Sequence, residues 1–297
     1  MEKLRFEQNL EMDKVLVGRH FEDVDDLTGG MDTDLKEVDE KSLEIISANA
    51  QMVIDDTHAK GMDKVLIISS PRKRAYSTAS LLKETVEEKD EDLKVAVRKD
   101  DRFTELSHGE IVLPPDYVPG RRIGFLKSAW KVFWAETFNE NGDYNNPNYR
   151  FGDPVALETG GYKHPELRES FTSYGESYRE LSQRYYDAIL DYLEHRSGVK
   201  SRGINVVLLA HSATLAILGE LSCVAREMSQ GYIMVKKGDL MKTCWKNYLD
   251  RMKRDDYVEA DFGGMKAFSL EDIDDELILF MREELSFVSD PKNYEKS

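Results

Sequence analysis

Two histidines in this chain each follow directly after a short apolar run, and an arginine precedes the first. Residues 15–18 read Val-Leu-Val-Gly and lead into Arg19 and His20, whereas the mostly apolar run 204–210 leads into His211. A third run, residues 65–68, ends in a segment that carries Arg74. Imidazole can act as a nucleophile, and a guanidinium matches the geometry of phosphate oxygens. This combination is typical of phosphoryl chemistry if the fold brings the residues together.

The order of strand and helix patterns predicts how they meet. Strands are expected over residues 12–17, 65–68, 93–97 and 204–209, and the segments between the first three have helical spacing. Such alternation is typical of a mostly parallel sheet with helices on both faces. Parallel strands deliver the residues at their C-terminal ends to one crevice. We therefore expect Arg19, His20, Arg74 and His211 to share one site.

Several finer features follow from local sequence signals. Gly61 is a plausible C-terminal cap of the first helix, and Pro71 suits the first turn of the next. Further elements are expected as helices near residues 125–138, 175–192, 215–224, 240–252 and 270–285, and as a short strand at residues 232–235.

The composition excludes some classes of protein. Of the 297 residues, 40% are hydrophobic, which is enough for a packed core and argues against wholesale disorder. Asp and Glu number 57 against 41 Lys and Arg, a formal charge of −16. So acidic an exterior disfavours nucleic acid and anionic membrane as partners. A few inward arginines are still enough to hold a small anionic molecule.

Cysteine usage and the N-terminal sequence predict the compartment. Cys223 and Cys244 form neither a disulfide framework nor a metal-binding spacing, as expected in a reducing environment. The N-terminus lacks a signal-peptide pattern, and no apolar stretch approaches the roughly 20 residues that cross a bilayer. We expect a cytoplasmic protein without a cofactor. We also expect no metal, because the arginines repel a cation and the histidines lack ligand spacing.

The middle of the chain departs from the strand–helix alternation. Six prolines occur between residues 114 and 165, among asparagines, tyrosines and tryptophans. We expect one domain over residues 1–297, with an insertion or lid at about 112–170 over the C-terminal edge of the sheet, where substrate-recognition loops usually lie. Its aromatic residues Trp130, Phe133 and Trp134 are expected to form a small core of its own.

At this point the motifs carry a resemblance to a family. The chain resembles the histidine phosphatase superfamily, in its phosphoglycerate-mutase-like branch. Three of four residues of the family's Arg-His-Gly-Glu motif are present, and its Ser-x-x-x-Arg-Ala-x-x-Thr-Ala motif is met in full. In chain order, the matching segments are Arg19-His20-Phe21-Glu22, Ser70 to Ala79, Phe103 to Gly109, Gly175-Glu176-Ser177 and residues 206–211. Each motif alone is weak, but five in family order are a strong signal.

The resemblance implies a fold and a catalytic set. The fold would be a three-layer α/β/α sandwich with a mostly parallel sheet. His20 would attack phosphorus and become a transient phosphohistidine, while Arg19, Arg74 and His211 hold the equatorial oxygens. Glu105 would protonate the leaving oxygen and then deprotonate the attacking water.

Further residues complete the predicted substrate-binding set, each with a simpler alternative. Ser212 follows the second histidine where the family commonly has glycine, and Glu22 and Thr28 are as readily loop residues. Arg121 and Arg122 would clamp an anion from the insertion, although surface ion pairs are the simpler interpretation in an acidic chain.

The departures from the family pattern keep three functions open. The mutase-type continuation Glu-Arg-His-Tyr-Gly is absent after Glu105, which favours hydrolysis. We therefore expect a metal-independent phosphatase acting on a small phosphorylated metabolite. One alternative is a phosphomutase with the same residues. The other is a non-catalytic phospholigand-binding or regulatory protein, because Phe21 replaces the usual glycine and its ring would block attack beside His20.

Overall fold

The computed structural model describes residues 14–21, 40–107, 109–111, 129, 132–139, 145–146, 148–153, 171–236, 239–240, 242–244, 246–247, 264–270 and 273–290. A five-stranded sheet in the order β3-β2-β6-β1-β7 forms its centre. All neighbouring pairs are parallel except β1 with β7, which is antiparallel. The strands are β1 (Lys14–Arg19), β2 (Lys64–Ser69), β3 (Lys94–Lys99), β6 (Ile204–Ala210) and β7 (Met265–Ser269).

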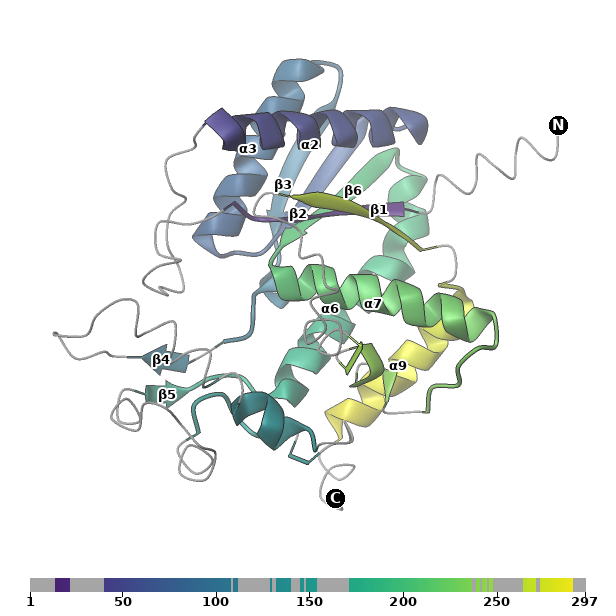
Figure 1. Cartoon of the computed structure of the whole chain (residues 1–297). Coiled ribbons are helices and arrows are strands. Elements are labelled where there is room, and N and C mark those ends of the chain that lie inside the picture. Colours follow the sequence, from purple (N-terminus) through teal and green to yellow (C-terminus); the bar gives the residue numbers. More distant parts are fainter. Residues whose placement is uncertain are drawn as a thin grey trace, which may run out of the picture.

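Helices cover both faces of this sheet, as Figure 1 shows for α2 and α3 on one side and for α7 and α9 on the other. Residues alternate between the faces because the side-chain period of a strand is two. Thus Val207 packs with α2 and α3, whereas Leu208 packs with α6, α7 and α9. The predicted three-layer α/β/α fold is therefore confirmed. The helices are α2 (Glu40–Ala59), α3 (Lys73–Lys89), α6 (Tyr178–Lys200), α7 (Ser212–Ser229) and α9 (Asp275–Ser289).

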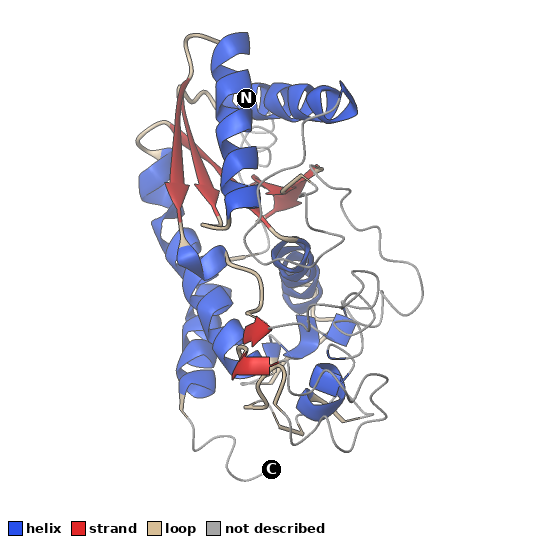
Figure 2. Cartoon of the chain, turned by 90° about the vertical axis from the view of Figure 1, so that its left-hand side faces the viewer, coloured by secondary structure: helices blue, strands red, loops and turns tan. Residues whose placement is uncertain are grey.

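A short 3₁₀ helix and a small second sheet connect β3 to α6. The 3₁₀ helix η1 (Asp101–Phe103) follows β3, and its backbone is capped by the carboxylate of Asp100. β4 (Gly109–Ile111) pairs antiparallel with β5 (Phe171–Tyr174). Figures 1 and 2 place this pair well away from the main sheet. A Ser177–Glu180 capping box then starts α6, as the Gly-Glu-Ser motif predicts.

Phe133 and Trp134 of the expected insertion belong to the main core, so the prediction that they form a separate small core is wrong. Phe133 is fully buried, and its ring lies 5.7 Å from that of Phe151. Trp134 and Phe138 both contact Tyr178 at the start of α6. Residues 132–137 are helical, in agreement with the helix expected near 125–138. Trp130 and most of residues 112–170 lie outside the described part.

Two local predictions are wrong. Residues 232–235 form no strand, because Ile233 and Val235 pack against the core from an irregular backbone while Tyr232 and Met234 are exposed. Pro71 lies before Arg72, the N-cap of α3, and so stands outside the first helical turn. Gly61 does follow α2 with a φ of 63°, the left-handed conformation expected of a C-terminal cap.

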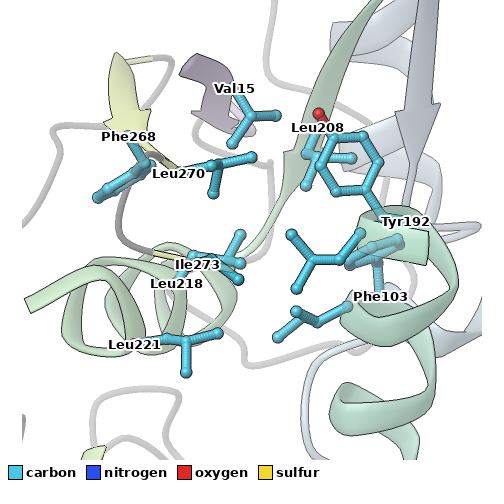
Figure 3. Close-up of a pocket in the computed structure, with 11 residues that line it drawn as sticks. Val15, Phe103, Tyr192, Leu208, Leu218, Leu221, Phe268, Leu270 and Ile273 are labelled. Atoms are coloured by element: carbon cyan, nitrogen blue, oxygen red, sulfur yellow. The ribbon is translucent and has the colours of Figure 1, made fainter. Parts of the chain in front are cut away.

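A narrow apolar cavity lies between the sheet and the helices on the α6 side (Figure 3). Val15 and Leu208 line it from the sheet, and Leu218 and Leu221 from α7. Since the lining is almost wholly aliphatic and aromatic, this cavity does not suit a phosphorylated ligand. Within the described residues, no helix is both long enough and apolar enough to span a bilayer.

The packing of α3 against the sheet yields a first prediction. Leu82 is fully buried, so Leu82→Ala leaves a cavity and should lower the free energy of unfolding by about 2–5 kcal/mol. Leu43→Ala on α2, where the side chain is 51% exposed, is the matched control and should change it by less than about 1 kcal/mol. Chemical denaturation measures both. Equal effects would contradict the assignment of Leu82 to this core.

Candidate active site

The C-terminal ends of β1, β2 and β6 place the two histidines beside each other. β6 lies between the other two strands, with Arg19 opposite Ala210 and Ser69 opposite Leu209. The ladder continues one residue further, since His20 N–H donates to Ala210 O at 3.1 Å. The imidazole centroids of His20 and His211 are consequently 5.0 Å apart, in a T-shaped arrangement. The expectation that these rings meet is confirmed.

Hydrogen bonds fix the orientation of the His20 ring. Its Nδ1 lies 2.6 Å from the carbonyl oxygen of Phe21, which can only accept, so Nδ1 carries the proton. Nε2 of a neutral ring then presents its lone pair, and Arg74 Nε donates to it at 3.2 Å. The atom with nucleophilic character is therefore Nε2, and it faces the arginine.

Arg74 also holds the carboxyl group. Its Nη2 donates to Glu105 Oε2 at 2.8 Å, and His211 Nδ1 is 3.7 Å from the same oxygen. The Glu105 side chain is 30% exposed, so it stands at the edge of the buried cluster and can reach both solvent and ligand. Four of the predicted catalytic residues, His20, Arg74, Glu105 and His211, thus form one group.

His211 is wholly buried and incompletely satisfied. Its Nε2 lies 2.9 Å from Ser70 Oγ, whereas Nδ1, directed toward Glu105, has no hydrogen-bond partner among the described residues. A buried polar atom without a partner destabilises a fold unless a ligand or water satisfies it. The geometry leaves Nδ1 to interact with a ligand oxygen.

The surroundings hold both histidines neutral. Burial lowers the pKa of His20 well below its usual value of 6.5, and the nearness of His211 and Arg74 lowers it further. Burial is also the main cause of the lowered pKa of His211, followed by the positive charges of Arg74, Arg72 and Arg19. A neutral ring is the form in which imidazole is a nucleophile.

Two helices begin at this cluster. α3 starts after Arg72 and α7 after His211, and neither N-terminus has a side-chain cap. Their uncapped N–H groups and dipoles favour an anion here. Ser212, one of the predicted substrate-binding residues, is the first residue of α7.

The remaining predicted site residues divide into two groups. Arg19 ends β1 and lies close enough for its charge to lower the pKa of His211. The ring of Phe21 packs into the core between the sheet and α2 and α3, so the expectation that it blocks His20 is not supported. The last four, Glu22, Thr28, Arg121 and Arg122, lie outside the described residues.

Ser70 and Arg184 are neighbours of the site to which the sequence alone gave no role. Ser70 is the first residue of the second motif, and its hydroxyl oxygen lies 2.9 Å from His211 Nε2. Arg184, in the second turn of α6, forms an ion pair at 2.6 Å with Glu176, which lies just before the N-cap Ser177, so no i,i+3 or i,i+4 helical spacing marks this pair in the sequence. Among the described residues, no group of three His, Cys, Asp or Glu side chains is placed to hold a metal ion.

No family model matches the chain, and no curated protein matches it significantly. Among solved structures, it is similar to a mycobacterial hydrolase at 16% identity, with 86% of this chain and 90% of that one covered and a TM-score of 0.44. It is also similar to the native mycobacterial glucosyl-3-phosphoglycerate phosphatase at 15% identity, 86% and 89% coverage, and a TM-score of 0.44. The structure of that phosphatase in complex with VO3 is 12% identical in sequence, covers 86% of this chain and 92% of its own, and has a TM-score of 0.43.

The buried histidines predict how stability depends on pH. Unfolded histidine binds a proton near pH 6.5, whereas the folded-state pKa of His211 is far lower, so the unfolded state holds more protons below pH 6.5. Stability should therefore fall as pH drops from about 6.5 to 5, by up to about 1.4 kcal/mol per pH unit for each such histidine. In His211→Gln the slope of the unfolding free energy with pH should decrease by the amount that corresponds to about one proton.

Denaturant titrations at pH 5.0 to 7.5 measure the slope. His195→Gln is the control, because that side chain is 70% exposed on α6, and it should retain the wild-type slope. An unchanged slope in His211→Gln would show that His211 is not held neutral by the fold.

Proposed function

We propose that this chain is a metal-independent phosphatase of the histidine phosphatase superfamily, acting on a small phosphorylated metabolite through a phosphohistidine on His20. The observation that carries the proposal is the orientation of that ring. Its Nδ1 is bound to the Phe21 carbonyl oxygen, and its Nε2 lone pair faces a cluster of Arg74, His211 and Glu105. A nucleophile, an anion clamp and a proton carrier are thus within reach of one phosphoryl group.

In the first step, the phosphoryl group enters between the two histidines. Arg74, which in the free protein donates to His20 Nε2 and Glu105, transfers its donors to the phosphoryl oxygens and exposes the lone pair. The Nε2–P bond forms as the ester P–O bond breaks. Glu105, which takes up a proton from solvent once the substrate has replaced it as the partner of Arg74, gives that proton to the leaving oxygen. His211 Nδ1 binds an equatorial oxygen, which satisfies the atom that lacks a partner in the free protein.

In the second step, the Glu105 carboxylate removes a proton from water as the water oxygen attacks phosphorus. The P–N bond breaks, its electron pair returns to His20 Nε2, and inorganic phosphate leaves. Arg74 and Arg19 stabilise the charge on the equatorial oxygens in both steps. No metal is needed in this scheme, because the guanidinium groups supply the positive charge.

Structural observations favour this proposal over the non-catalytic alternative. The Phe21 ring is packed in the core instead of beside the nucleophile, so the access route to Nε2 is not closed by it. The phosphomutase alternative uses the same residues and differs in the acceptor of the second step. The absence of the mutase-type sequence after Glu105 favours water as the acceptor.

The proposal extends to the surroundings in which the protein works. Cys223 and Cys244 are both free thiols, in keeping with a reducing cytoplasm. The charge of −16 disfavours nucleic acid or an anionic membrane as the partner, whereas the arginines of the site are enough to hold a small phosphorylated molecule.

Substitution of the two site histidines tests the proposal. His20→Ala removes the nucleophile and should lower kcat on an aryl phosphate by at least about 10⁴-fold, and His211→Ala by about 10²–10³-fold. Continuous release of the phenol measures both, with His195→Ala as the control on an exposed ring. Full activity in either site variant would defeat the assignment.

Three further measurements use the same wild-type protein. Alkaline quenching during turnover, followed by peptide mass spectrometry, should locate a phosphoryl group on His20. A chelator should leave kcat unchanged, and a loss restored by a divalent cation would contradict metal independence. Product analysis with an added alcohol separates phosphatase from mutase, because a mutase transfers the phosphoryl group in preference to releasing phosphate.

A further inference from the structure

The segment that carries Glu105 has no regular secondary structure of its own beyond η1, yet its side chain must be placed to within a fraction of an ångström. Residues 104–107 run in extended or irregular conformation after η1. Phe103 and Leu106 on either side of Glu105 are 2% exposed, so the segment is anchored by two apolar side chains. Apolar packing is not directional. It holds the segment against the core but does not by itself fix the orientation of the Glu105 side chain.

A partly buried arginine from α6, Arg184, supplies the missing directional contacts. Arg184 Nη1 donates to the carbonyl oxygen of Arg102 at 2.8 Å and to that of Thr104 at 2.5 Å. The second acceptor belongs to the residue directly before Glu105. Two hydrogen bonds from one planar guanidinium fix the peptide plane from which Glu105 begins.

Glu176 in turn fixes Arg184 and also holds the backbone that follows Glu105. Arg184 Nε and Nη2 donate to the two oxygens of Glu176, at 2.9 and 2.6 Å. The backbone N–H of Glu176 donates to the carbonyl oxygen of Ser107 at 2.8 Å, and the Ser107 N–H lies 3.4 Å from Glu176 Oε2. The pair thus holds Thr104 before Glu105 and Ser107 after it.

Burial makes these contacts matter. The Arg184 and Glu176 side chains are 19% and 14% exposed, so the pair is bidentate, largely desolvated and directional. Another arginine, Arg102, joins the same segment to α6 through the exposed carboxylates of Asp187 and Asp191. Within the described residues, the Glu176–Arg184 pair is the contact that brackets Glu105 itself.

We propose that Arg184 and Glu176 are positioning residues for Glu105, which hold its carboxyl group where it donates a proton to the leaving oxygen and accepts one from water. The inference rests on the proposed function, because it assigns these residues to the general acid–base step. Neither side chain touches the substrate. The charge of Arg184 also contributes to the lowered pKa of His211, which places it close to the reacting group.

Two substrates with different leaving groups test the positioning role, because a merely structural role would affect both substrates equally. An alkyl leaving oxygen needs a proton as the P–O bond breaks, whereas a dinitrophenolate leaves without one. In Arg184→Gln, kcat/KM for an alkyl phosphate should fall by about 10–10²-fold and kcat/KM for 2,4-dinitrophenyl phosphate by less than about threefold. The ratio kcat/KM is compared because it reports the step in which the leaving oxygen departs, whereas kcat also contains the hydrolysis of the phosphohistidine that both substrates share. Glu176→Gln should show the same selectivity, and Glu105→Gln a larger one.

Two comparisons complete the design. Arg196→Gln is the matched control, because this arginine also lies on α6 and donates to a backbone carbonyl, that of Ile273, away from the site. It should leave the ratio of the two substrates unchanged. The double variant Glu105→Gln/Arg184→Gln should show the same ratio as Glu105→Gln alone, because the arginine acts through the carboxyl group.

The outcomes separate the inference from the proposed function. An equal loss for both substrates in Arg184→Gln, or a further change of ratio in the double variant, would overturn the positioning role while phosphatase activity stands. An inactive wild type would instead overturn the proposed function. Hydrogen exchange then decides the contact alone: faster exchange at residues 105–107 in Arg184→Gln than in Arg196→Gln supports it, and equal exchange rejects it.

Discussion

The in-register pairing of β6 with β1 and β2 is the constraint on which the site depends. Because these three strands are parallel and adjacent, their last residues emerge at one edge, and the main chain rather than any side chain sets the spacing. The ladder extends past the strands, with Ser70 N–H donating to Leu209 O at 3.1 Å and His20 N–H to Ala210 O at the same distance. A shift of one residue in either pairing would turn His20 or Ser70 to the opposite face of the sheet.

That constraint brings like charges together, and the structure offsets the cost in two ways. The histidines are buried and lose their protons, so the arginines repel no neighbouring imidazolium at neutral pH. Arg74 is paired with Glu105, and its Nε is satisfied by the lone pair of His20. In the free site the guanidinium of Arg74 is therefore satisfied by Glu105 and His20, whereas His211 Nδ1 lacks a hydrogen-bond partner among the described residues. A phosphate dianion can replace the carboxylate as the partner of Arg74.

The sequence was sufficient for the central strands, which are buried on both faces of the sheet. Short continuous apolar runs mark β1, β2 and β6, and the predicted strands agree with the observed bounds to within about two residues. β7 was missed because Met265–Ser269 is an edge strand with a half-exposed, mixed pattern that resembles a loop. The strand expected at residues 232–235 was a wrong prediction. An irregular segment can also place every second apolar side chain on the core, as Ile233 and Val235 do here.

The site was predictable where a motif sits at a strand end, and less so where a residue acts through the backbone of another segment. Arg19, His20 and His211 follow from strand ends alone, whereas Glu105 needed a family resemblance and the contacts of Arg184 needed coordinates. Every residue has a backbone carbonyl group that can accept a hydrogen bond. The acceptor of such a contact therefore leaves no pattern in the sequence.

Phe21 shows how a departure from a family pattern is accommodated by local chemistry. Its N–H donates to Thr78 Oγ1 at 3.1 Å, and that hydroxyl donates to the carbonyl oxygen of Arg74 at 2.8 Å. The carbonyl oxygen of Phe21 accepts from His20 Nδ1, and Arg74 Nε donates to His20 Nε2. These four contacts form a closed circuit through both motifs that needs only the backbone at position 21. The side chain there is free to be large, provided that it packs into the core, and the orientation of the nucleophile is preserved without glycine.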